Sequence, residues 1–179
     1  MPRLFVAAWA SDAVRLRARE VQGALRERGL ALRFMEVEQL HATLAFLGRV
    51  HEARVGDVER ACGAAASACE PFAVTIDCLG GFPTDGRAAV AWLGSRASAD
   101  GFARTAQAVR ARLRDAGVAH DEKNALAHVT IARAATAVDL PALDIPATPW
   151  RIAEIALVES QTLPDGSRYQ TVRTWGLGA

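Results

Sequence analysis

Histidine and threonine recur at one spacing at two places in the 179-residue chain. Residues 41–46 read HATLAF and residues 128–133 read HVTIAR, so each copy is His-x-Thr followed by apolar residues. Both runs are typical of strands, in which residues i and i+2 point to the same face. We therefore expect His41 and Thr43 to share one face, and His128 and Thr130 to share another.

If the two strands lie side by side, two imidazoles and two hydroxyls converge on a space that suits one phosphate. Histidine serves as acid or base near neutral pH, and threonine hydroxyls donate hydrogen bonds to phosphate oxygens. A histidine on an apolar strand is more often a hydrogen-bonded core residue than a catalyst. However, only four histidines occur in the chain, and two of them carry this pattern. The pattern alone leaves the structural and the catalytic interpretation open.

Other catalytic chemistries have less support. Two histidines without clustered carboxylates or a third ligand make a poor metal site, and no GxSxG elbow is present. The stretch 80–86 contains several turn residues but lacks GxGxxG spacing and a following helix start, so we interpret it as a loop. We expect no metal and no cofactor. His51 is interpreted as a surface or capping residue, and His120 as a surface residue, with a third catalytic histidine as the alternative.

Composition indicates a folded protein without a general affinity for long nucleic acids. Apolar residues make up 51%, too many for a disordered chain, and the formal net charge is +1. A broad grip on nucleic acid requires a clearly basic protein, whereas one phosphate end requires only a local positive charge. The three cysteines, Cys62, Cys69 and Cys78, have no paired spacing for disulfides or zinc. Without an apolar run of membrane-spanning length or a signal peptide, we expect a cytoplasmic monomer with no membrane partner.

The periodicity of apolar residues predicts an α+β fold with antiparallel pairing. Ser11 or Asp12 caps the first helix and Ser98 caps the third, while Gly29 and Gly117 end these helices. The expected helices are 14–25, 55–69 and 98–116, and the expected strands are 4–9, 32–37, 40–47, 72–79, 88–93, 127–134, 150–162 and 167–177. The two motifs lie about half a chain length apart. This separation predicts one domain over 1–179, built from two intertwined, pseudo-symmetric lobes that each supply one motif strand to a central cleft.

With these motifs the chain resembles the 2H phosphoesterase superfamily. Within it, the chain is most similar to the RNA 2′,3′-cyclic phosphodiesterases, also called 2′-5′ RNA ligase-like or LigT/ThpR-like proteins. The resemblance is carried by four stretches of the chain. Residues 3–9 resemble the family's first strand, and residues 40–48 and 127–133 resemble its two signatures. Its closing hairpin is matched by Leu157, Ser160, Gly166, Tyr169 and 175–177. One departure is that 125–127 reads ALA where the family often has Phe-x-Pro before the second histidine. The absent proline removes a local constraint on the entry into that strand.

The resemblance implies a bilobal fold with antiparallel sheets and flanking helices around a central cleft. It implies His41 as the general acid and His128 as the general base. Thr43 and Thr130 are expected to donate hydrogen bonds to the phosphate, and Arg133 is expected to be a further phosphate contact. Arg133 lies at an odd offset from His128, which places its side chain on the opposite face of a regular strand. A bulge or the end of the strand is needed to turn it inward.

The implied reaction is hydrolysis of an RNA terminal 2′,3′-cyclic phosphate to a 2′-phosphate, with 2′-5′ RNA ligation as its reverse. The expected partners are RNA ends or small nucleotides that carry a 2′,3′-cyclic phosphate. Two alternatives stay open at this point. One is a phosphodiesterase that acts on a small cyclic nucleotide or an ADP-ribose cyclic phosphate, and the other is a protein that binds RNA ends without turnover.

Overall fold

The computed structural model describes residues 1–84, 86–97, 99–123, 125–163 and 166–179. It has the predicted α+β class. The helices are α1 Asp12–Glu27, α2 Val55–Ser67 and α3 Asp100–Asp115, with short 3-10 turns at Val37–Gln39 and Glu52–Arg54. The strands are β1 Arg3–Trp9, β2 Arg33–Phe34, β3 His41–Arg49, β4 Phe72–Ile76, β5 Cys78–Pro83, β6 Arg87–Gly94, β7 His128–Asp139, β8 Thr148–Ile152, β9 Glu154–Leu163 and β10 Gly166–Gly176.

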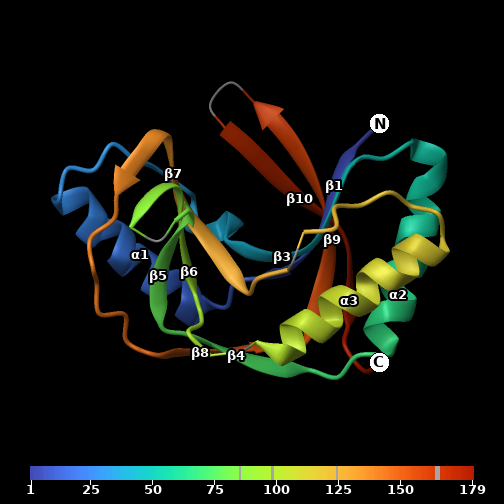
Figure 1. Ribbon diagram of the computed structural model, residues 1–179. Coiled ribbons are helices and arrows are strands. Elements are labelled where there is room, and N and C mark those ends of the chain that lie inside the picture. The colour runs from blue at the N-terminus through green and yellow to red at the C-terminus, as the bar shows by residue number, and fades with distance from the viewer. Residues whose placement is uncertain (85, 98, 124, 164–165) are drawn as a thin grey trace.

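Two four-stranded sheets form the body of the protein, one on each side of the view in Figure 1. The first has the order β10-β9-β1-β3 and the second has the order β2-β7-β6-β5, and neighbouring strands are antiparallel throughout. A two-stranded sheet of β4 and β8 runs along the bottom of the view. Each large sheet contains one motif strand, β3 in the first and β7 in the second, so the predicted antiparallel pairing is confirmed.

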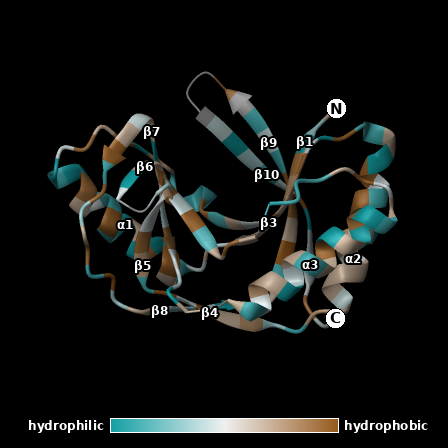
Figure 2. Cartoon of the chain, viewed as in Figure 1, coloured by the Kyte–Doolittle hydropathy of each residue, from teal (hydrophilic) through white to brown (hydrophobic). Residues whose placement is uncertain are grey.

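Two of the three helices pack away from the sheet of the strand that precedes them. α1 follows β1 of the first sheet but packs near β7 and β8, whereas α3 follows β6 of the second sheet but packs against β3, β4 and α2 (Figure 1). Each helix carries both hydrophobic and hydrophilic residues in Figure 2, as an amphipathic helix does. The face of α1 that the sequence predicted as apolar is buried, namely Val14, Ala18, Val21 and Leu25.

The predicted ends of α1 are confirmed. The Ser11 hydroxyl accepts a hydrogen bond from the Val14 backbone N–H at 3.4 Å, and Gly29 follows the helix with a φ of +68°. Gly117 follows α3 with a φ of +64°. The predicted cap at Ser98 and the predicted turn at Pro164-Asp165 lie outside the described residues.

Several predicted strand boundaries are wrong. The predicted strand 72–79 is divided at Asp77 into β4 and β5, which belong to different sheets, and the predicted loop 80–86 continues as strand to Pro83. At this break the Asp77 carboxylate accepts a hydrogen bond from the Arg96 backbone N–H at 2.8 Å, and the Asp77 N–H donates to the Gly94 carbonyl at 2.9 Å. The predicted strand 150–162 is likewise divided at Ala153. The strand predicted at 32–37 is only two residues long, and β7 extends beyond its predicted end.

A membrane-crossing helix would need more length and more apolar character than any helix in the described ranges has.

Candidate active site

The two motif histidines occupy equivalent positions, His41 at the start of β3 and His128 at the start of β7. In each, ring atom Nδ1 lies within hydrogen-bond distance of a carbonyl oxygen two residues earlier, 2.8 Å from Gln39 and 3.1 Å from Leu126. Because a carbonyl oxygen only accepts, Nδ1 carries the hydrogen in both rings. Nε2 is then the atom of each imidazole that is available to give or take a proton.

Aromatic side chains surround both imidazoles. The rings around His41 are Phe5, Trp9 and Tyr169, at centroid separations of 4.8, 5.6 and 5.1 Å. The rings around His128 are Phe82 and Trp92, at 5.2 and 5.9 Å. These contacts hold the rings in place and shield them in part from water, since both histidines remain half-buried.

A glycine of the 80–86 stretch makes room for the indole of Trp92. A Cβ atom at Gly80 would lie 2.3 Å from this indole, and one at Gly94 would lie 2.7 Å from it. This stretch therefore supports the second histidine through packing.

The pKa of His41 is lowered from its ordinary value of 6.5 to about 4, chiefly by burial, with smaller lowering contributions from His128 and Arg133 and against the raising effect of the bond to Gln39. Burial also lowers the pKa of His128, again with a contribution from Arg133. Both imidazoles are therefore neutral near pH 7 in the free protein. Arg133 lies within electrostatic reach of both rings, and the two rings lie within reach of each other.

Each motif strand contains a β-bulge directly after its threonine. In β3, Val6 and Ala7 of β1 pair with residues 45 and 43, so Leu44 is the extra residue. In β7, residues 91 and 92 of β6 pair with 132 and 130, so Ile131 is the extra residue. The burial pattern of β7 agrees, since 131 and 132 are buried in succession.

The bulges explain how Arg133 comes to lie on the same side of β7 as His128. One extra residue shifts the alternation of side chains by one position, so Arg133 returns to the face of His128 and Thr130, and Phe46 returns to the face of His41. A regular strand would have turned both side chains away.

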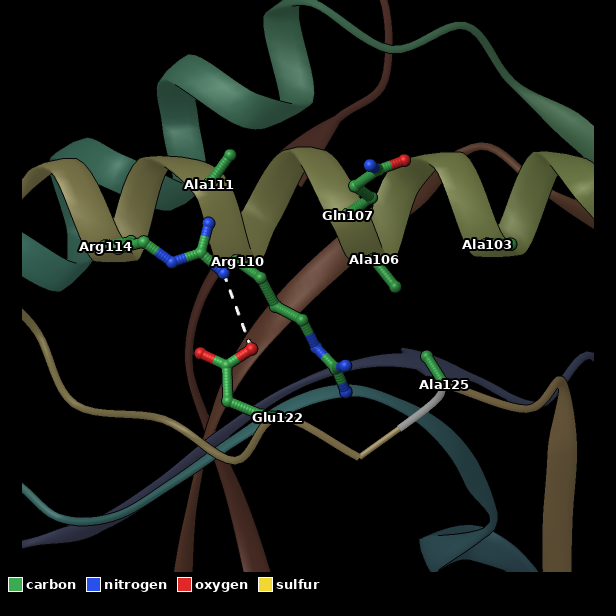
Figure 3. Close-up of a pocket in the computed structure, with 8 residues that line it drawn as sticks. All are labelled: Ala103, Ala106, Gln107, Arg110, Ala111, Arg114, Glu122 and Ala125. Carbon is green, nitrogen blue, oxygen red and sulfur yellow. Dashed lines mark hydrogen bonds and ion pairs between the residues drawn. The ribbon is translucent and has the colours of Figure 1, made fainter.

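Side chains from the helices hold the bulge carbonyls. The Gln22 amide of α1 donates to the Ile131 oxygen at 3.0 Å, and the Arg110 guanidinium of α3 donates to the Leu44 oxygen at 3.1 Å. Arg110 points away from α3 toward the strands beneath it in Figure 3. Neither residue was among the predicted site residues. The signal was a polar side chain directly beside the apolar face of each helix.

His41, Thr43 and Arg133 line one cavity of about 310 Å³, together with Arg3, Arg33 and Tyr169. His128 lines a second cavity of about 290 Å³ with Trp92 and Leu126. Thr130 lines neither of them; it is half-buried and points to the same side of β7 as His128. A larger cavity of about 520 Å³ lies under α3, lined in part by Arg110, Arg114 and Glu122 (Figure 3), and contains no motif residue.

The other two histidines lie apart from these cavities. His51 caps the 3-10 turn after it by accepting a hydrogen bond from the Ala53 N–H at 3.3 Å, as predicted. The prediction of a surface position for His120 is wrong, because its side chain is only 3% exposed and its Nδ1 bonds to the Val118 carbonyl at 3.1 Å. In the described ranges no three His, Cys, Asp or Glu side chains gather closely enough to bind a metal ion.

The family model described as LigT like Phosphoesterase matches residues 9–92, which include the first motif. The RNA 2′,3′-cyclic phosphodiesterase of Archaeoglobus fulgidus is 31% identical over 132 residues, which cover 73% of this chain and 72% of the relative. The protein of the same name from Thermus thermophilus is 30% identical and covers 98% and 90% of the two chains.

The chain therefore belongs to the LigT-like phosphoesterase family of the 2H superfamily. A crystal structure of a protein from Thermus thermophilus superimposes with a TM-score of 0.81 at 28% identity, over 98% of both chains. The fold class and the family predicted from the paired motifs are confirmed.

Proposed function

We propose that this protein hydrolyses the 2′,3′-cyclic phosphate at the end of an RNA chain and leaves a 2′-phosphate. The observation that carries the proposal is the matched pair of histidines, each with Nδ1 on a carbonyl and Nε2 available for proton transfer. The similar proteins named RNA 2′,3′-cyclic phosphodiesterase support the choice of substrate.

In the proposed reaction Nε2 of His128 takes a proton from water, and the water oxygen bonds to phosphorus. The bond between phosphorus and O3′ breaks, and O3′ receives the proton from Nε2 of His41. The products are a 2′-phosphate and a free 3′-hydroxyl. The assignment of acid and base follows the family resemblance.

His41 needs a proton to act as the acid, although it is neutral in the free protein near pH 7. A bound phosphate anion favours the charged imidazole and so raises the pKa of His41. The bound substrate thus favours protonation of His41, which then gives this proton to the leaving O3′. Thr43 and Thr130 would donate hydrogen bonds to the non-bridging oxygens, and Arg133 would balance the charge that develops there.

The same groups would support 2′-5′ ligation if a 5′-hydroxyl of a second RNA took the place of water. The oxygen of that hydroxyl would bond to phosphorus, O3′ would leave with a proton, and a 2′-5′ linkage would result. Ligation is thus the same displacement with a different nucleophile, and not the reverse of the hydrolysis as the sequence-based expectation had it.

A turnover assay tests the proposal and its alternatives. An oligonucleotide with a 2′,3′-cyclic phosphate is compared with 2′,3′-cyclic mononucleotides and an ADP-ribose cyclic phosphate, and products are identified as 2′- or 3′-phosphates. We expect the oligonucleotide to give a 2′-phosphate. Turnover of the small compounds alone would favour the first alternative, and binding of the oligonucleotide without turnover would favour an RNA-end binding protein.

A further inference from the structure

Three arginines, Arg3, Arg33 and Arg133, line the same cavity as His41. None of them forms an ion pair with an acidic side chain in the part of the chain that the structure describes. A cyclic phosphate diester carries a single negative charge. Three guanidinium groups therefore exceed what one cyclic phosphate can balance.

Arg33 and Arg133 lie directly opposite each other in the antiparallel pair of β2 and β7. Side chains in such a pair lie on one face of the sheet, and like charges there repel each other. Both side chains reach the cavity, where an anion between them would reverse this repulsion. Both residues are exposed, so water and salt screen this repulsion in the free protein, and the pair is placed to bind an anion.

Arg3 approaches the same cavity from the first sheet. Its guanidinium lies over the Phe46 ring, 5.1 Å from the ring centroid. Phe46 occupies the position in the first motif that Arg133 occupies in the second. The first motif lacks a basic residue at this place, and Arg3 brings a guanidinium to it.

We propose that Arg3 and Arg33 bind a second phosphate, the phosphodiester on O5′ of the nucleoside that carries the cyclic phosphate. This inference rests on the proposed function and names the preferred substrate, an RNA end of two or more nucleotides. Contacts to this phosphate are the same for every base, so they select chain length without selecting sequence. Guanidinium groups suit this task because they bond to two phosphate oxygens at once.

Three substrates that all carry the cyclic phosphate, but differ at the 5′ position, test whether a second phosphate is bound. Adenosine 2′,3′-cyclic phosphate lacks the second phosphate, its 5′-phosphorylated form has it as a monoester, and the ApA dinucleotide with a 2′,3′-cyclic end has it as a diester. The value of kcat/KM is measured for each with the wild type, Arg3→Gln, Arg33→Gln and the double variant. Arg104→Gln is the matched control, because Arg104 is exposed on α3 and lines none of the cavities described above.

We expect the wild type to prefer either two-phosphate substrate by about tenfold or more, the factor for a hydrogen bond between charged groups. Each substitution should reduce this preference, the double variant should abolish most of it, and KM should change more than kcat. Arg104→Gln should keep the wild-type preference. If the dinucleotide is preferred as strongly as the 5′-phosphorylated mononucleotide, a phosphodiester of an RNA chain can supply the second phosphate. If only the 5′-phosphorylated mononucleotide is turned over, the assignment of an RNA substrate is overturned.

Equal kcat/KM for all three substrates in the wild type would overturn the inference and leave the proposed function intact. Equal losses on all three substrates in the variants would also overturn it. If no substrate is turned over, the proposed function fails. The second phosphate site is then tested by binding of two nucleotides that are not turned over. Adenosine 2′,5′-bisphosphate should then bind about tenfold or more tightly than adenosine 2′-phosphate, and equal dissociation constants would overturn the second site.

Discussion

Gln22 of α1 is joined to Ile131 of β7 by a hydrogen bond of 3.0 Å from its side-chain amide to the carbonyl oxygen of the bulge. The same amide donates to the Met35 carbonyl at 2.8 Å, and the Met35 N–H donates to the Ile131 oxygen at 2.9 Å. Gln22 is only 2% exposed. Through these bonds a helix in the first half of the chain holds the bulge that lies two residues before Arg133 in the second half.

Replacement of Gln22 by leucine should lower the free energy of unfolding by about 1–3 kcal/mol, because the Met35 carbonyl loses its side-chain donor and the Ile131 carbonyl keeps only the Met35 N–H. The Gln22→Leu protein should also bind inorganic phosphate more weakly, since the bulge that directs Arg133 is less constrained. Urea unfolding and calorimetry measure the two effects. Gln107→Leu on the exposed face of α3 is the control, with a change within about 0.5 kcal/mol. Unchanged phosphate affinity in Gln22→Leu would contradict the positioning role.

His41→Ala and His128→Ala should each fold, bind adenosine 2′-phosphate and lose about 10²–10⁴-fold in kcat. The double variant should lose far less than the product of the two effects, because the histidines act as a unit. His51→Ala, an exposed histidine outside the cleft, should retain wild-type turnover. Wild-type rates in both cleft variants would show that these histidines are structural.

Stability should decrease in mild acid because both cleft histidines have lowered pKa values. The unfolded chain binds more protons than the folded chain between the folded pKa of His41, about 4, and the ordinary value of 6.5. The free energy of unfolding should therefore fall as pH falls through this range and stay level above it. Urea titrations at several pH values measure the slope. His41→Asn should flatten it, and His51→Asn should not; parallel slopes in the wild type and His41→Asn would count against the buried, neutral imidazole.

Thr43→Val and Thr130→Val should weaken phosphate binding and lower kcat less than the histidine substitutions do. Each removes a hydrogen-bond donor but leaves both proton carriers in place. Steady-state kinetics and the dissociation constant of adenosine 2′-phosphate measure these effects. Thr75→Val on an exposed position of β4 is the matched control. Losses as large as those of His128→Ala would assign a threonine to proton transfer.

Turnover should survive prolonged chelation, because protein side chains supply the acid, the base and the oxyanion donors of the proposed reaction. The assay compares the rate on a cyclic-phosphate substrate before and after dialysis against EDTA. A loss of activity that one added divalent ion restores would reject the two-histidine mechanism.

The motif strands and the antiparallel class could be predicted because they depend on local periodicity. Alternating polarity at 41–44 and 128–131 is visible within a few residues. The break at Asp77 could not be read in the same way, since one polar residue does not interrupt an alternating pattern; the hydrogen bond to its carboxylate comes from the distant Arg96.

The bulges and the grouping of charged side chains at the site could not be predicted without the tertiary structure. The extra residues Leu44 and Ile131 appear only when each motif strand is paired with its neighbour. The sequence analysis named Arg133 from family resemblance but missed Arg33, which lies opposite it on another strand. Pairing between segments about a hundred residues apart leaves no local signal in one sequence.

The exchange of α1 and α3 between the two large sheets also limits how the cleft can move. Hinge closure requires two bodies that are joined at a few flexible positions. Here the chain passes from one side to the other between β1 and α1, between β2 and β3, between β6 and α3 and between α3 and β7, and β3 contacts β7 directly, so the two sheets are joined at many positions. We therefore expect the walls of the cleft to keep their spacing while a nucleotide enters and leaves, so that the reacting groups are already placed when it arrives.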